Sequence, residues 1–237
     1  MSNQVYYSDF YTKVYPIGMR IPTLYDYYKD YESSRILDKN RDNQELIDKH
    51  KELGAYALDI SNFIQQFKKF DVLPDRLWIN SEKDEQPSDA EYIFRIKGGG
   101  IVMRENCANV FKKFKLGENI LTPLKIYELE NGNLWRNEIF YFFNLCEQRH
   151  YLANLQSSDN LRFRPYPMSK FKEGSYANFG SVDNGDIELS YLALDSDIDI
   201  WHDPRLIGSI FMSEPLYETL AQADIHRPWN TSICKII

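Results

Sequence analysis

Three aspartates alternate with other residues in the last quarter of the sequence, at Asp195, Asp197 and Asp199. This Asp-x-Asp-x-Asp spacing matches the first ligands of a calcium-binding loop, which also requires glycine at its sixth position and glutamate at its twelfth. Ile200 and Leu206 occupy those two positions. The spacing therefore does not predict a calcium loop.

The same aspartates are interleaved with apolar residues, which is the pattern of a strand with one buried face. The apolar residues are Leu192, Leu194, Ile198 and Ile200. This alternation predicts a strand whose outer face carries Asp195, Asp197 and Asp199. We interpret that acidic stripe as a candidate docking surface for a basic partner, and a simply solvated acidic face is the alternative. A divalent-cation site made of Asp197, Asp199 and Asp203 is a further alternative.

The cysteines, histidines and glycines do not match templates for catalysis. Cys107, Cys146 and Cys234 are an odd number without a Cys-x-x-Cys pair, which argues against a disulfide framework and a zinc site. There is no Gly-x-Ser-x-Gly turn, and the glycines at 98–100 lack the sequence context of a phosphate-binding loop. We therefore expect no catalytic residue, no metal, no cofactor and no enzymatic activity.

Two regions have the periodicity of helices. Between residues 43 and 70, apolar positions recur at spacings of three and four, which predicts a long helix that ends before Pro74. The later region has the same spacing at Cys107, Val110, Phe111 and Phe114, and Gly117 closes it. We expect strands before this second helix, at 92–96 and 101–103, and a buried strand at 139–145.

A short sequence repeat relates two parts of the chain. Residues 208–216 match residues 99–107 at an offset of 109, with identical glycine, isoleucine, methionine and glutamate positions. Both copies read as a short strand followed by a helix, which suggests an internal duplication of a strand-helix-strand unit. Ser213 is placed to cap the second helix, whereas the first copy has Arg104 at the corresponding position.

The beginning of the chain is rich in tyrosine. Eight of the seventeen tyrosines lie within the first 31 residues, among them Tyr25, Tyr27 and Tyr28. Tyrosine combines a large apolar ring with a polar tip and is enriched at protein interfaces. These three tyrosines are therefore further candidates for partner binding, although a β-rich segment that packs on the rest of the fold would have the same composition.

One stretch carries a family resemblance: Asp199-Ile-Trp201-His-Asp203-Pro204-Arg-Leu-Ile-Gly208-Ser-Ile-Phe211-Met-Ser213-Glu-Pro-Leu-Tyr-Glu-Thr-Leu220. Together with Gly100-Ile-Val-Met-Arg-Glu105, Leu116-Gly117-Glu118 and Pro123, it resembles the immunity protein 11 family of bacterial polymorphic toxin systems. The resemblance covers residues 72–237 and implies a protein that binds and neutralises the toxin encoded beside it. We therefore expect two parts: a tyrosine-rich segment with a long helix at 1–71, which lies outside the resemblance, and an immunity-family domain at 72–237.

Composition sets limits on the partner. The chain has 35 acidic and 28 basic residues and a formal charge of −7, the wrong sign for neutralising the phosphates of a nucleic acid. Its most apolar uncharged stretch, residues 139–146, is much shorter than the roughly 20 residues that span a membrane. We expect an α+β protein in the cytoplasm that binds a toxin domain, and neither nucleic acid nor membrane. A metal-dependent hydrolase and an intracellular ligand-binding or regulatory module are the alternatives.

Overall fold

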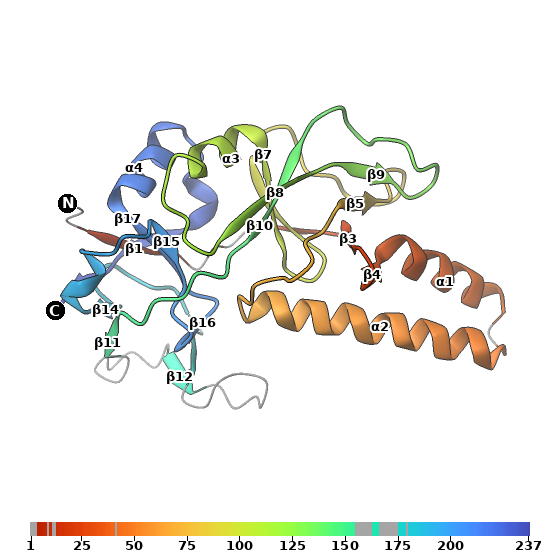
Figure 1. The fold of residues 1–237 in the computed structure, drawn as a ribbon, viewed down its shortest axis with the longest axis horizontal. Helices are drawn as coiled ribbons and strands as arrows, with labels where there is room; N and C mark the ends of the chain where they lie inside the picture. Colours follow the sequence, from red (N-terminus) through yellow and green to blue (C-terminus); the bar gives the residue numbers. More distant parts are fainter. Residues whose placement is uncertain are drawn as a thin grey trace.

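The computed structural model describes residues 4–8, 10, 13–40, 42–154, 163–165, 175–178 and 180–237. Within these residues, helices and short strands are mixed, and the strands form several separate sheets, so the predicted α+β class is confirmed. Figure 1 shows an elongated molecule with a helical pair at one end and helix α4 with its sheet at the other. No helix in the described part is long and apolar enough to cross a membrane.

The first strand-helix-strand unit lies in the middle of the molecule. Its elements are β7 (Ile101–Arg104), α3 (Glu105–Phe111) and β8 (Ile120–Leu124), within a sheet of order β2-β6-β7-β10-β8. Gly98 and Gly99 have φ angles of 86° and 94°, a conformation that favours glycine, and they make the turn between β6 (Ile93–Ile96) and β7. Every residue of β10 (Phe140–Asn144) is buried, which confirms the predicted core strand.

The second unit has the same order of elements in another sheet. It consists of β17 (Ile210–Ser213), α4 (Glu214–Gln222) and β18 (Thr231–Ile233). Ser213 caps α4, because its Oγ accepts the backbone N–H of Leu216 at 3.4 Å. Arg104 makes no such side-chain hydrogen bond at the start of α3. Both expectations about the helix starts are therefore confirmed.

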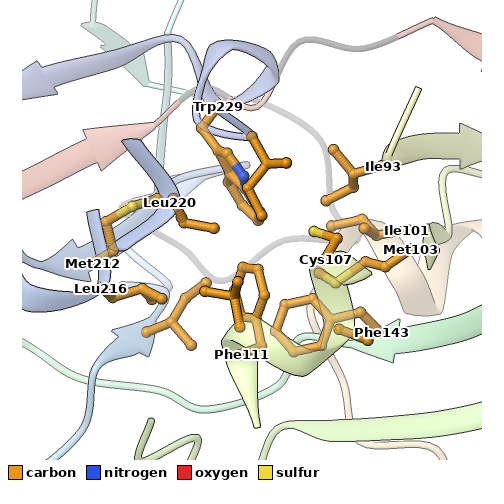
Figure 2. Close-up of a cluster of buried hydrophobic side chains, with 14 of the residues drawn as sticks. Ile93, Ile101, Met103, Cys107, Phe111, Phe143, Met212, Leu216, Leu220 and Trp229 are labelled. Atoms are coloured by element: carbon orange, nitrogen blue, oxygen red, sulfur yellow. The ribbon is translucent and has the colours of Figure 1, made fainter. Parts of the chain in front are cut away.

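Equivalent positions of the two copies meet in one hydrophobic core. Strand residues from both copies point into it, and so does the apolar face of each helix (Figure 2). The paired positions are Ile101 and Ile210, Met103 and Met212, Cys107 and Leu216, and Phe111 and Leu220. The repeat that the sequence suggests thus corresponds to two units that pack face to face.

Strands from the N-terminal segment complete the sheets of the later part. β1 (Val5–Ser8) lies between β17 and β18, and β2 (Val14–Tyr15) pairs in parallel with β6. A further sheet joins β3 (Gly18–Ile21) and β4 (Tyr25–Asp26) to strands from beyond residue 72. These are β5 (Arg76–Ile79) and β9 (Ile126–Glu128). The predicted boundary between 1–71 and 72–237 therefore does not separate two sets of sheets.

The long helix forms an arm with its neighbour. α1 (Tyr27–Lys39) and α2 (Gln44–Gln65) pack side by side and project from the body (Figure 1). None of the α2 side chains is buried, although the residues of the predicted apolar stripe are its less exposed ones. The helix ends earlier than residue 70, because Phe67 adopts a left-handed backbone conformation with φ of 50°.

The remaining elements are short. They are β11 (Leu152–Asn154), β12 (Phe163–Pro165), β13 (Tyr176–Asn178), β14 (Glu188–Leu189), β15 (Ile200–Trp201), β16 (Leu206–Ile207), β19 (Lys235–Ile236), and two 3₁₀ turns, η1 (Tyr191–Ala193) and η2 (Arg227–Trp229). β15 joins the sheet of order β15-β17-β1-β18. The segment before it, which contains the predicted acidic stripe, leads to the candidate site.

Candidate functional site

The segment that contains the acidic stripe is a turn and not a strand. Of the predicted strand only Ile200 belongs to a strand, which it forms with the following Trp201, and Tyr191–Ala193 form the 3₁₀ turn η1. Backbone bonds fix the start of this turn, because Ser190 N donates to Tyr151 O at 2.8 Å and Tyr191 N donates to Ile237 O at 3.1 Å. The predicted inward position of Leu192 is wrong, since its neighbour Ala193 is buried instead.

Asp199 has a structural role that the stripe interpretation did not foresee. Its Oδ2 accepts the backbone N–H of Lys115 at 2.8 Å, and its Oδ1 accepts the hydroxyl of Ser213 at 2.6 Å. The carboxylate therefore links the loop after α3 to the cap of α4. Asp199 is partly buried and is not one of the exposed acidic groups of the turn.

The alternative cation site is not formed by the three aspartates proposed for it. Asp203 is buried, and its carboxylate pairs with Arg205 at 2.8 Å and accepts the backbone N–H of Leu152 at 3.1 Å. Asp197 instead lies within 3.3 Å of Arg149. Across the described residues, no three histidine, cysteine, aspartate or glutamate side chains are grouped to hold a metal ion.

The exposed part of the turn combines acidic and apolar side chains. Tyr191 is 64% exposed and Leu192 is 50% exposed, and Ile237 beside them is exposed as well. Asp195 is exposed, and the side chain of Asp197 is 76% exposed. We call Tyr191, Leu192, Asp195 and Asp197 the acidic turn. Sequence reasoning selected its aspartates but missed Tyr191 and Leu192, because a strand pattern placed Leu192 in the core.

The three candidate tyrosines are at the other end of the molecule and pack against it. They lie at β4 and the start of α1, far from β15 in Figure 1. Tyr25 is buried and donates its hydroxyl to Asp30 at 3.0 Å. The ring of Tyr27 covers Gly18, and burial raises the pKa of the Tyr27 hydroxyl to about 12. The ring of Tyr28 is tilted by 34° against that of Trp78, with the ring centroids 5.0 Å apart. The structure does not bring these tyrosines and the acidic turn together.

The three thiols lie in environments that favour their protonated form. Cys107, Cys146 and Cys234 are all unpaired and buried. Burial raises the pKa of Cys107 to about 12 and that of Cys146 to about 11, and it also raises the pKa of Cys234. Because the thiolate is the nucleophilic form, these cysteines behave at neutral pH as small apolar side chains.

His202 has a strongly lowered pKa. It is buried against the ring of Phe67 at 4.7 Å, and its Nε2 has no hydrogen-bond partner among the described residues. Burial lowers its pKa to about 4, with His150 adding to the decrease and Asp203 opposing it. His202 is therefore neutral at pH 7, and in the folded chain it gains a proton only near pH 4.

This shift predicts an acid sensitivity. The unfolded chain binds a proton at His202 below about pH 6.5, whereas the folded chain does so only near pH 4. The free energy of unfolding therefore decreases as the pH is lowered from about 6.5 to about 4. At pH 5 the loss from this group should be about 2 kcal/mol. Urea titrations of the wild type and His202→Gln at pH 7 and pH 5 measure it. An equal loss for both proteins would show that His202 does not contribute.

The comparisons with known proteins leave the family open. No protein-family model matches the chain, and no curated protein is similar to it. The resemblance to the immunity protein 11 family therefore stays a prediction from the residues quoted above. What can be argued about function rests on the side chains and surfaces of this chain.

Proposed function

We propose that this protein is a non-catalytic immunity protein that binds and neutralises a cognate bacterial toxin. The observation that carries the proposal is the acidic turn, in which an exposed tyrosine and leucine are followed along the chain by two exposed aspartates. Tyrosine is among the residues that contribute most to protein interfaces, usually within a ring of weaker contacts. The acidic turn therefore offers an anchor and a charged rim in one place.

The charge of the turn indicates the partner's surface. Asp195 and Asp197 project from a protein whose formal charge is −7. Acidic groups at the rim of an interface accelerate association with a basic surface and disfavour an acidic one. The proposed partner is thus a toxin domain with a basic binding surface.

The turn is held in place before any partner arrives. The backbone bonds of Ser190 and Tyr191 fix one end, and Asp199 ties the other end to the loop after α3. Ala193 and Ile198 are buried between these ends. A surface that is already ordered loses less conformational entropy on binding, which supports tight association.

The proposed compartment is the cytoplasm of the cell that makes the toxin. The three unpaired cysteines are compatible with this, because thiols stay reduced there. In this proposal, protection comes from occupying the toxin and requires no reaction by the immunity protein.

Co-expression with the toxin domain encoded in the neighbouring reading frame tests the proposal. Tyr191→Ser should reduce toxin affinity by about 30-fold or more, as expected for an interface anchor worth at least 2 kcal/mol, and should weaken protection of growth. Tyr56→Ser is the matched control, because Tyr56 is an exposed tyrosine on α2, in the helical arm. Wild-type affinity for the Tyr191 variant would contradict the proposed surface. Absence of binding by the wild type would contradict the proposed function.

A further inference from the structure

A cavity of about 460 Å³ lies where the two repeated units meet. Strands of the sheet that contains β7 and of the sheet that contains β17 line it, together with the end of α2 and residues from β13 and β16. Its apolar wall includes Phe10, Ile64, Ile101, Phe143 and Ile210. The wall also carries polar side chains, among them Gln65, Asn144 and Asn178, and a cavity of this size that combines apolar and polar groups is typical of a small-molecule site.

Among the described residues of this wall, Arg95 is the charged one. It belongs to β6 and is partly buried, and burial lowers its pKa. Its guanidinium lies against the hairpin turn, since Nη2 is 3.2 Å from the place where a Cβ on Gly99 would be. Among the described residues, no carboxylate lies within 4.0 Å of Arg95, whereas Arg104 and Arg205 are paired with acidic residues.

A second, smaller cavity of about 140 Å³ adjoins the first. The two share Gln65, Phe67, Ile207 and Gly208. The smaller cavity reaches His202, whose buried Nε2 is without a partner in the described part. Phe67, between the two cavities, has a left-handed backbone that a non-glycine residue adopts only at an energetic cost. The junction therefore combines a cation without a carboxylate partner in the described part of the chain, a buried imidazole nitrogen without a hydrogen-bond partner there, and local backbone strain.

We propose that this cavity binds a small apolar molecule that carries one carboxylate, and that Arg95 pairs with this carboxylate. A partly buried guanidinium without a counter-charge is unfavourable, and an anionic ligand would remove that cost through charge-assisted hydrogen bonds. The other polar side chains of the wall include the neutral amides of Gln65 and Asn178, which cannot balance the charge. One cation beside an apolar wall matches a monoanion with a hydrocarbon body.

Calorimetric titration with decanoate, below its micellar concentration, tests this proposal. The wild type should bind decanoate at one saturable site, and Arg95→Gln should weaken that binding at least about tenfold. Decanol has the same hydrocarbon chain without the charge, so it should bind the wild type and the Arg95 variant alike. Ile207→Trp, which places a larger side chain in the cavity wall, should weaken binding of both compounds.

Lys97→Gln is the matched control, because Lys97 is an exposed base on the same hairpin and does not line the cavity. It should bind decanoate like the wild type. Three results would overturn the proposal: no saturable decanoate binding by the wild type, equal binding by Arg95→Gln, or equal weakening by Lys97→Gln. Circular dichroism checks that each variant is folded, and Arg95→Lys, which keeps the charge, should retain part of the affinity. This inference is independent of toxin binding, which Arg95→Gln should leave unchanged.

Discussion

Replacing Gly117 with alanine should lower the free energy of unfolding by about 3 kcal/mol or more. Gly117 has a φ of 61°, and a Cβ there would collide with Oε2 of Glu147 and lie 2.7 Å from its Cδ. Glu147 cannot easily move away, because it is buried and its Oε2 accepts the backbone N–H of Glu118 at 2.6 Å. The substitution thus combines backbone strain with the loss of a partly buried hydrogen bond.

Gly132→Ala separates the two contributions. Gly132 also has a positive φ, of 72°, but no atom lies within 4 Å of the place where its Cβ would be. Its substitution should cost only the conformational part, about 1 to 2 kcal/mol. Urea unfolding of the two variants measures the difference. Equal losses would show that Glu147 yields and that the close approach at Gly117 is not required.

Replacing Arg104 with methionine should cost about 3 kcal/mol. The Arg104 side chain is 9% exposed, and its Nη1 donates to Glu138 at 2.6 Å. Its other guanidinium nitrogens donate to the backbone oxygens of Glu91 and Ser88, each at 3.0 Å. Methionine would leave a partly buried carboxylate and two carbonyl groups without this donor, which is costly even though the apolar volume is retained.

Arg136→Met is the control for Arg104, because Arg136 belongs to the same ionic cluster but pairs with the exposed Asp89. Exposed ion pairs contribute little, so this variant should lose less than about 1 kcal/mol. Thermal and urea unfolding of both variants provide the comparison. A similarly small loss for Arg104→Met would mean that the ion pair with Glu138 does not hold the loop that contains Ser88 and Glu91 against β7.

The elements that sequence predicts correctly depend on local signals. The stripe of α2, the glycine turn before β7 and the cap of α4 are each set by residues only a few positions apart. The buried strand β10 is a continuous apolar run and needs no distant information. These signals survive in the fold because tertiary contacts reinforce them.

The acidic turn could not be predicted in full because distant contacts determine it. Asp199 is held by the backbone of Lys115, which is 84 residues earlier, and Tyr191 by the backbone of Ile237. Alternation over a few residues does not distinguish such a tethered turn from a strand. The same limit applies to Tyr27, which packs on Gly18, and to the cavity around Arg95, whose walls come from both repeated units.

The central claim is that the acidic turn captures a basic toxin surface, and association kinetics test it most directly. The test variant is Asp195→Asn/Asp197→Asn, which keeps Asp199 because the role of Asp199 is structural. The control variant, Asp38→Asn/Asp42→Asn, removes the same amount of charge from the exposed helical arm. Association with the neighbouring toxin domain is measured by surface capture at low and at physiological salt. We expect the variant of the turn to associate more slowly than the wild type and the control at low salt, and we expect the difference to shrink as screening shortens to about 8 Å. Equal association rates for both variants at low salt would contradict the claim.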